Sequence, residues 1–193
     1  MTKSEKTRRF IIEQSAVIFN KKGIAGTSIT DLMEATKLAK GGIYGNFNSK
    51  DEICAEVFNY LTGIVSSGLD RATVGKATPR EKLFGILNYY HDNLAPNEMG
   101  GCPLLNFGTE ADDTNPELKQ RVAKMIRKSQ QRIAKVIEEG QATGEFDKRT
   151  DASTFAVKMF TMIEGGIFAA RVTNNKGIMK TIVDLLTKDI KAL

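Results

Sequence analysis

Apolar residues recur every three to four positions along nearly the whole chain, and the alternation typical of a β-strand is absent. This spacing predicts an all-α protein of about nine helices. The first helix is expected from about Ser4 to Lys22 and should end at Gly23. Two further helices are expected near the other end of the sequence, over residues 151–172 and 176–191.

Short polar signals mark the starts of the longer helices. Ser49 and Glu52 have the spacing of a capping box. Residues 78–81 and 114–117 each combine a capping side chain, a proline in the first turn and an acidic residue. Long helices are therefore predicted to begin at these three places, with a short helix over about 104–111 before the last of them.

Three short segments follow the first helix. Residues 27–35 form a two-turn helix with Ser28 and Asp31 as a capping box, residues 36–38 form a turn, and residues 39–45 form a second short helix. Apolar side chains can hold both short helices against the first one: Ile29, Leu32, Leu38, Ile43 and Phe47. This is the layout of a helix-turn-helix, whose second helix enters the major groove of DNA.

Composition narrows the class of protein further. A hydrophobic content of 41% in 193 residues is enough for a core and argues against general disorder. The most apolar stretch, residues 155–170, is interrupted by Lys158 and Glu164 and is too short to span a bilayer. The sequence shows no secretory signal, and two cysteines do not make a disulfide framework. We therefore expect a cytoplasmic protein with reduced thiols and no membrane association.

The net charge of +5 is unevenly distributed. Nine basic and four acidic residues lie up to Lys50, so the first quarter of the chain carries the whole excess and the remainder is neutral. Including Asp51 and Glu52 reduces the excess of the first part to +3. A basic head on a neutral body indicates a module that binds a polyanion, with an ordinary solvated basic face as the alternative.

The composition of the second short helix suits contact with DNA. Gly41 and Gly42 together make a short helix less stable, by about 1 kcal/mol each relative to alanine. That loss is easier to understand if the backbone must approach a phosphate or a base edge closely. Lys40 can reach a guanine edge or a phosphate, and Tyr44 and Asn46 can donate to phosphates. Ser28 and Lys50 each lie at a helix start, where backbone N–H groups favour an anion.

Four groups of residues between Arg9 and Ile53 show a recognisable pattern. They are Ile11-Ile12 with Ala16 and Phe19, then Gly23, then Thr27-Ser28-Ile29, and finally Ile43-Tyr44-Gly45-Asn46-Phe47-Asn48-Ser49-Lys50-Asp51-Glu52-Ile53. In this arrangement the chain resembles the DNA-binding domain of the TetR family of transcriptional regulators, over roughly the first quarter of its length.

The resemblance implies a three-helix helix-turn-helix domain over residues 1–50 and a helical ligand-binding and dimerisation domain over residues 51–193. It implies a homodimer that binds a palindromic operator in double-stranded DNA, usually as a repressor that a small-molecule inducer releases. It implies neither an enzyme nor a protein with a cofactor or a metal. The residues implied in DNA contact are Ser28, Thr30, Lys40, Gly41, Gly42, Tyr44, Asn46 and Lys50.

Three positions depart from the usual pattern of the family. Ala39 stands where serine or threonine often caps the recognition helix, Gly42 where serine, threonine or alanine is usual, and Asn46 where histidine is commonest. These departures bear on which operator sequence is bound and not on whether the protein binds DNA.

Cys102 is a candidate chemical sensor. The run Gly101–Asn106 is similar to a Gly-Cys-apolar-apolar motif in a subgroup of the family, in which some cysteines react with electrophiles or oxidants. A thiol at a helix N-terminus is favoured as the reactive thiolate. The alternative is a small buried hydrophobic residue, which is the role expected for Cys54. Further candidates for a ligand pocket, each of which could equally be a core or surface residue, are His91, Phe107, Met125, Met159 and Met162.

The pair Gly165-Gly166 lies mid-helix in an apolar segment. Such a pair indicates two helices that cross closely, with a helix kink as the alternative. In the family the last two helices form a four-helix bundle in the dimer. The resemblance therefore implies a dimer interface that includes Gly165, Gly166, Ile182, Leu185 and Leu186.

Two other classes of function fit parts of the pattern. One is a small enzyme with Cys102 as its nucleophile, for which His91, the single histidine, is the available base. The other is a chromatin-like protein that binds DNA without sequence preference. The recognition helix argues against the enzyme, and the neutral C-terminal part argues against the chromatin-like protein.

Overall fold

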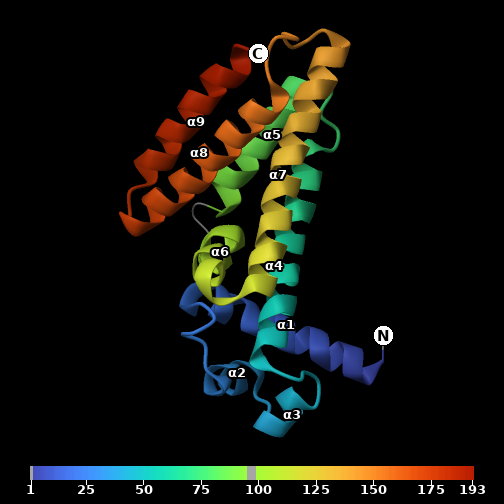
Figure 1. The fold of residues 1–193 in the computed structure, drawn as a ribbon, viewed down its shortest axis with the longest axis vertical. Coiled ribbons are helices and arrows are strands. Elements are labelled where there is room, and N and C mark those ends of the chain that lie inside the picture. Colours follow the sequence, from blue (N-terminus) through green and yellow to red (C-terminus); the bar gives the residue numbers. More distant parts are fainter. Residues whose placement is uncertain (1, 95–98) are drawn as a thin grey trace. The chain divides into compact units, whose positions relative to one another are not determined.

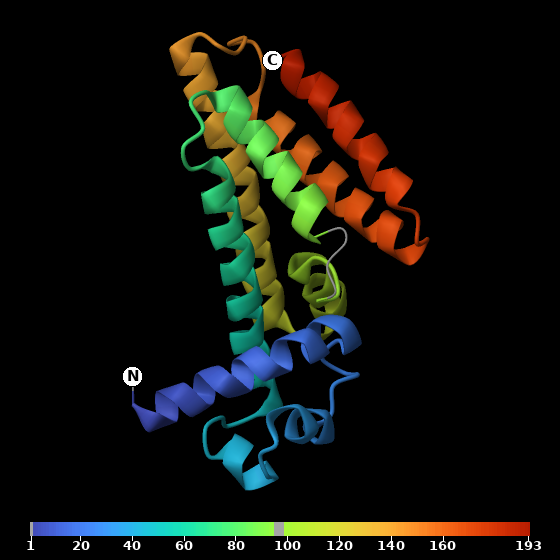
Figure 2. The same cartoon turned by 180° about the vertical axis from the view of Figure 1, so that it is seen from behind.

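The computed structural model describes residues 2–94 and 99–193, and in these residues helices are the only regular secondary structure (Figures 1 and 2). Nine α-helices and one π-helical segment, η1, are present there, so the all-α prediction is confirmed. Their bounds are α1 Lys3–Lys22, α2 Ile29–Thr36, α3 Lys40–Tyr44, α4 Lys50–Thr73, α5 Pro79–Tyr89, η1 Tyr90–Leu94, α6 Pro103–Thr114, α7 Pro116–Thr143, α8 Ala152–Val172 and α9 Lys176–Lys191. In the same residues no helix is long and apolar enough to cross a membrane.

Local sequence determines where several helices begin. The hydroxyl groups of Ser28 and Thr78 accept hydrogen bonds from the backbone N–H groups of Asp31 and Glu81, whose carboxylates accept from the capping residues in return. The side-chain oxygen of Asn115 caps α7 in a similar way. These are the helix starts that the sequence predicts. The π-helical turn η1 that continues α5 was not predicted, and such turns are frequent near functional sites.

The first of two compact units comprises Met1–Val65 and Pro103–Val122. It therefore holds α1 to α3, most of α4, all of α6 and the first residues of α7. Its buried apolar core is formed by Ile11, Ala16, Phe19, Leu32, Ile43, Phe47, Ile53, Cys54, Val57, Phe58, Leu61, Leu104, Phe107, Ala111, Leu118 and Val122. Phe58 of α4 and Phe107 of α6 pack with ring centroids 5.5 Å apart.

The two compact units are divided within α4, the helix at whose start the predicted domains were divided; the domain bounds themselves stay a prediction. The boundary runs within α4, between Val65 and Ser66, and the unit also includes α6 from later in the sequence. The reason is that α4 continues the same core beyond residue 50: Ile53 and Val57 are fully buried, and Phe58 contacts Phe107 of α6.

The second compact unit comprises Ser66–Cys102 and Ala123–Leu193. In it α8 packs along α9, and α5 also contacts α9; α8 and α9 lie side by side in both views (Figures 1 and 2). Its buried apolar core is formed by Leu69, Leu83, Ile86, Leu87, Tyr90, Cys102, Ile133, Ala134, Val136, Ile137, Phe146, Ala156, Met159, Phe160, Ile163, Ile167, Ala170, Met179, Leu186 and Ile190.

The glycine pair of α8 divides between two environments. Gly166 is buried where α8 crosses α9, and a Cβ atom there would lie 2.9 Å from Ile182 Cγ1 and 3.1 Å from Met179 Sδ. Gly165 is exposed, and a Cβ atom there would have open space around it. The predicted close crossing is therefore present, but Gly166 makes it within one subunit.

The predicted interface set is corrected at Leu186 for the same reason. Leu186 is fully buried inside the second unit, because it lies on the core-facing side of α9, whereas its neighbour Leu185 is 44% exposed. A side chain without exposed surface in the subunit cannot contact a partner. Of the rest of the predicted set, Gly165 and Leu185 are exposed and Ile182 is half-buried, and their place in a dimer interface stays a prediction.

Candidate functional site

α3 is a short exposed helix whose order depends on its packing. It has five residues, and Ala39 at its N-cap makes no side-chain hydrogen bond to it. Within α3, the side chain of Ile43 is fully buried. At the C-terminal end of the helix the N–H of Gly45 donates to the carbonyl of Gly41. The helix is therefore held by one apolar anchor rather than by its own helical propensity.

Most of the predicted DNA-contact residues lie on the surface of α2, α3 and their flanks. Tyr44 is 38% exposed, so its ring and hydroxyl are accessible from outside the protein. The hydroxyl of Ser28 caps α2 by accepting the N–H of Asp31. The exposed members of the predicted set are Ser28, Thr30, Lys40, Gly41, Gly42 and Tyr44.

Neither glycine of α3 is required by the fold. A Cβ atom on Gly41 would meet no other atom within 4 Å, and one on Gly42 would make ordinary van der Waals contact with Leu38 Cβ at 3.5 Å. Both residues also avoid the positive φ values that favour glycine. The packing of the protein would therefore accept alanine at both positions, as it would at Gly63 and Gly165. What distinguishes Gly41 and Gly42 is that they are adjacent on the exposed face of α3.

The last two predicted DNA-contact residues have partners inside the first unit. The Asn46 amide Nδ2 donates to the carbonyl of Gly42 at 2.9 Å, which caps the end of α3. The Lys50 ammonium Nζ donates to the carbonyls of Ile24 at 2.7 Å and Thr27 at 2.9 Å. These contacts were not predicted, and for Lys50 the partners lie more than twenty residues away in sequence. Their contact with DNA stays a prediction.

Arg8 supports the same region, although no sequence motif pointed to it. Its guanidinium lies 4.1 Å from the centroid of the Phe47 ring, donates to the carbonyl of Asn46 at 2.5 Å and pairs with Glu52 at 2.6 Å. The pKa of Glu52 is lowered, first by the hydrogen bond from the Asn48 backbone and then by Arg8. Arg8 thus joins α1 to the segment after α3, a contact that no local spacing in the sequence signals.

The predicted ligand-binding residues lie in both compact units, and their part in ligand binding stays a prediction. His91 lines an open recess of about 430 Å³ in the second unit, together with Arg171 and Lys176. Phe107 is a core residue of the first unit, where it packs on Phe58. Met159 is fully buried. Met125 and Met162 are half-buried in the second unit.

Cys102 forms a buried pair with Glu164, a residue that the sequence did not mark as functional. The thiol donates to Glu164 Oε1 at 3.1 Å, and the two residues are 2% and 7% exposed. The other carboxylate oxygen, Oε2, is buried, and no residue of the described ranges 2–94 and 99–193 donates to it. Burial raises the pKa of Glu164 to about 7, and the hydrogen bond from Cys102 opposes this shift. Burial also raises the pKa of Tyr90, and a charge on Glu164 acts in the same direction.

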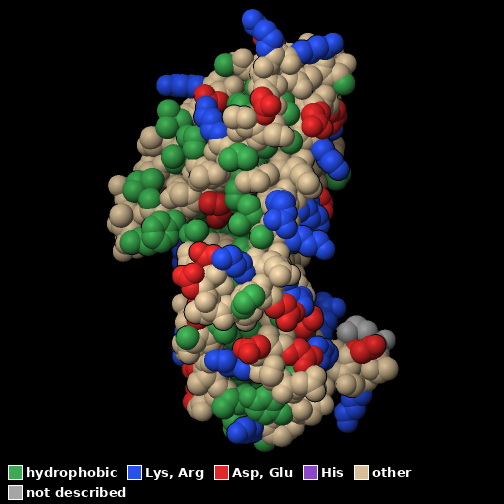
Figure 3. All heavy atoms as spheres, in the orientation of Figure 1, with side chains coloured by type: hydrophobic (Ala, Val, Ile, Leu, Met, Phe, Trp, Pro, Cys, Tyr) green, Lys and Arg blue, Asp and Glu red, His purple; other side chains and the backbone are tan. Residues whose placement is uncertain are grey.

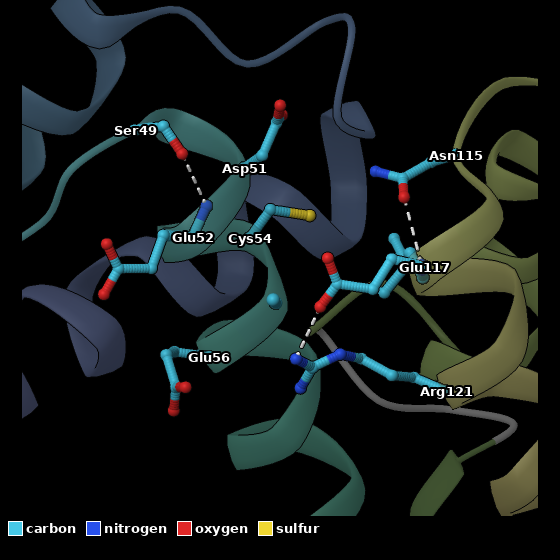
Figure 4. Close-up of a pocket in the computed structure, with 10 residues that line it drawn as sticks. Ser49, Asp51, Glu52, Cys54, Glu56, Asn115, Glu117 and Arg121 are labelled. Atoms are coloured by element: carbon cyan, nitrogen blue, oxygen red, sulfur yellow. Dashed lines mark hydrogen bonds and ion pairs between the residues drawn. The ribbon is translucent and has the colours of Figure 1, made fainter.

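Cys54 lies beside a second recess, of about 240 Å³, in the first unit (Figure 4). Four carboxylate residues, Asp51, Glu52, Glu56 and Glu117, line this recess, and Glu117 pairs with Arg121 at 2.8 Å. Burial raises the pKa of Cys54 to about 12, so its thiol stays protonated. An acidic recess with an inert thiol fits neither phosphate binding nor nucleophilic chemistry, and Cys54 acts as a core residue.

Titratable side chains offer no metal centre in the described ranges, 2–94 and 99–193. No group of three or more histidine, cysteine, aspartate or glutamate residues there is placed to hold a metal ion. The two features with functional geometry are therefore the exposed surface around α3 and the buried Cys102–Glu164 pair.

Comparison with known proteins bears on both units. Residues 11–57 match the family model described as bacterial regulatory proteins, tetR family, and residues 79–186 match the tetracyclin repressor-like C-terminal domain. A TetR-family transcriptional regulator from Cytophaga hutchinsonii has a solved structure that is similar over 100% of this chain and 97% of its own, with a TM-score of 0.94 and 36% identity.

Two further relatives agree with these matches. The structure of a TetR transcriptional regulator from Chloroflexus aurantiacus covers 99% of this chain and 97% of its own, with a TM-score of 0.94 and 32% identity. The transcriptional repressor DhaR from a Mycobacterium species is 24% identical over 173 residues, which are 88% of this chain and 84% of DhaR. The chain belongs to the TetR family of helix-turn-helix transcriptional regulators, which are not enzymes.

Proposed function

We propose that the protein is a sequence-specific repressor, which binds a palindromic operator as a homodimer and is released when its second unit responds to a small molecule. The observation that carries the proposal is the pair Gly41 and Gly42 on the exposed face of α3, which the fold does not require. A DNA backbone or base edge at this surface accounts for both glycines. Similarity to DhaR, which is named a transcriptional repressor, supports repression rather than activation.

Dimerisation is supported by an apolar face on the second unit. Val157, Gly165, Phe168 and Val172 have helical spacing along α8, and Leu185 lies on α9. Phe168 is 54% exposed and Val172 is 66% exposed, and Figure 3 shows hydrophobic side chains at the surface over these two helices. Large apolar side chains that stay exposed along adjacent helices are typical of an interface. A two-fold dimer would present two copies of α3 to two half-sites.

The release step is supported by the Cys102–Glu164 pair. A buried carboxyl with one unpartnered oxygen is a destabilising feature unless another group completes it. An inducer with a hydrogen-bond donor would complete it. Covalent modification of Cys102 is the second route, because the adjacent carboxylate can accept the thiol proton. At 2% exposure, Cys102 reacts only when the structure around it opens. Either event would favour a conformer with a different spacing between the two α3 helices.

Replacement of Gly41 by alanine tests the DNA-binding part of the proposal. Gly41→Ala should stabilise the protein by about 0.5–1 kcal/mol, because alanine loses less conformational freedom in a helix. The added methyl group should weaken binding to a duplex selected from a random library against the wild-type protein. Gly63→Ala, also helical and also with open space at its Cβ position, is the matched control and should leave DNA affinity unchanged. Unchanged affinity of Gly41→Ala for the selected duplex would contradict the assignment of α3.

A further inference from the structure

A carboxylate from α6 holds the turn that joins α1 to α2. Glu110 Oε2 accepts the backbone N–H of Ile24 and Oε1 accepts the N–H of Ala25, both at 2.5 Å. The two partners are 86 and 85 residues away in sequence, and all of them lie in the first unit. Hydrogen bonds to an ionised carboxylate are shorter and stronger than those between neutral groups. Both carboxylate oxygens of Glu110 therefore accept hydrogen bonds from one short stretch of backbone.

A second side chain of α6 contacts α1 just before this turn. Asn106, one helical turn before Glu110, donates from Nδ2 to the backbone carbonyl of Asn20 at 2.9 Å and to its side-chain oxygen at 3.1 Å. Asn20 is buried near the C-terminal end of α1. Asn106 and Glu110 therefore hydrogen-bond to the chain before and after Gly23, where α1 ends.

Gly23 is the residue that permits this arrangement. Its φ of +75° lies in the left-handed region, and a Cβ atom there would come within 2.5 Å of Glu110 Oε2. The carbonyls of Ile24 and Thr27 accept from the Lys50 ammonium of α4. The turn thus has its amide groups bound to a negative side chain from one helix and its carbonyls bound to a positive side chain from another.

The turn leads directly into the helix-turn-helix. Ser28, the N-cap of α2, comes immediately after Thr27, and α3 packs on α2. The direction in which the chain leaves the turn therefore helps to set where α2 and α3 lie, together with the packing of α2 on α1. We propose that Glu110 is a positioning residue for operator binding, which acts from α6 by fixing the turn that carries the helix-turn-helix and does not itself contact DNA. This inference rests on the proposed binding of an operator through α3.

The loss of Glu110 should have opposite effects on operator affinity if the residue acts only through its charge or if it positions the turn. Removal of a negative charge from a DNA-binding protein should tighten its binding to every duplex, because the phosphates are anionic. A loosened turn should instead weaken binding to the operator, since the recognition helix is less well placed, and should leave non-specific binding nearly unchanged. The sign of the effect on operator affinity therefore separates the two roles.

The experiment compares Glu110→Gln and Glu110→Asp with the wild type on two duplexes, one selected from a random library against the wild-type protein and one scrambled duplex of equal composition. Glutamine removes the charge, whereas aspartate keeps it but shortens the reach. Both variants should bind the selected duplex at least about tenfold more weakly and the scrambled duplex within about twofold of the wild type. The dependence of operator affinity on salt should keep its slope, because no phosphate contact is lost.

Asp113→Asn is the matched control, because it removes the same charge from an exposed site on the same helix. It should bind both duplexes at least as tightly as the wild type. Operator affinity of Glu110→Gln that equals or exceeds the wild-type value would overturn the proposal. A selection that yields no preferred sequence would instead refute operator binding itself, so the two failures are distinguishable.

Amide hydrogen exchange tests the proposal without a variant. The N–H groups of the half-buried Ile24 and the exposed Ala25 should exchange much more slowly than those of an unprotected turn, because Glu110 accepts both of them. Exchange of these two amides at the rate of an unprotected chain would show that Glu110 does not hold the turn. This measurement decides the matter even if the Glu110 variants fail to fold.

Discussion

Replacement of Glu164 by glutamine should remove a specific pH dependence from the stability of the second unit. Burial raises the pKa of Glu164 to about 7, compared with an ordinary value of 4.5. The folded protein therefore binds the proton more tightly than the unfolded chain. Protonation of Glu164 therefore stabilises the folded protein fully below about pH 4.5, and this stabilisation is lost as the pH rises through about 7. Between pH 5 and pH 8 this one group should destabilise the wild type by about 2–3 kcal/mol.

Glutamine resembles the protonated carboxyl in shape and does not titrate. In Glu164→Gln the Cys102 thiol can still donate to the side-chain oxygen, and any cost of the buried amide nitrogen is the same at both pH values. Urea unfolding at pH 5 and pH 8, at one fixed protein concentration, gives the free energy of unfolding for each protein. The difference between the two pH values should be about 2–3 kcal/mol smaller for the variant than for the wild type.

Both proteins share the other titrating groups, so the contribution of those groups cancels when the pH-dependent change in unfolding free energy is compared between the two proteins. Glu138→Gln, an exposed position on α7, is the control and should behave as the wild type does at both pH values. If wild type and Glu164→Gln lose stability in parallel between pH 5 and pH 8, the carboxyl is already ionised in the folded protein. Burial would then not keep Glu164 protonated, and the expected pH dependence would be refuted.

Three further outcomes are expected. Lys40→Ala should change the ranking among operator variants by about 1–3 kcal/mol at one base pair, and a uniform loss on every duplex would assign Lys40 to the phosphates instead. Gly165→Leu should fold normally but sediment as a monomer, because the added side chain has open space within the subunit and would meet the partner subunit in the dimer. Gly166→Leu should instead lower the melting temperature, because its side chain would clash with α9. Limiting treatment with N-ethylmaleimide should weaken operator binding by the wild type but not by Cys102→Ser; if the serine variant also dissociates, the thiol is not the sensor.

Local chemistry explains how much of the fold could be predicted. Helix starts at Thr78 and Asn115 depend on residues within one turn of each other, so their spacing in the sequence is the physical cause of the structure. The helix-turn-helix is equally local, because Ser28 caps α2 and Ile43 anchors α3 within a few residues of each motif. Family resemblance added a regulatory function to this pattern, and the family matches confirm that the chain is a TetR-family transcriptional regulator.

The parts that could not be predicted depend on partners that are distant in sequence. Glu110 looks like any polar residue of an amphipathic helix until its amide partners, 85 residues away, are known. Glu164 interrupts an apolar stretch, and only the fold shows that Cys102 reaches it. Leu185 and Leu186 are indistinguishable by spacing alone, because a sequence pattern reveals the period of a helix but not which face meets a neighbour.

The short length of α3 has a consequence for the heat of operator recognition. A five-residue helix with two glycines and no side-chain hydrogen bond at its N-cap is expected to retain some backbone freedom in the unbound protein. Contact with a base edge must remove that freedom, at a cost of about 1–2 kcal/mol of conformational entropy for each residue that becomes fixed. Calorimetry should therefore show favourable binding enthalpy offset by an unfavourable entropy term. A recognition helix that becomes ordered on the duplex can also tolerate small differences in groove shape between operators.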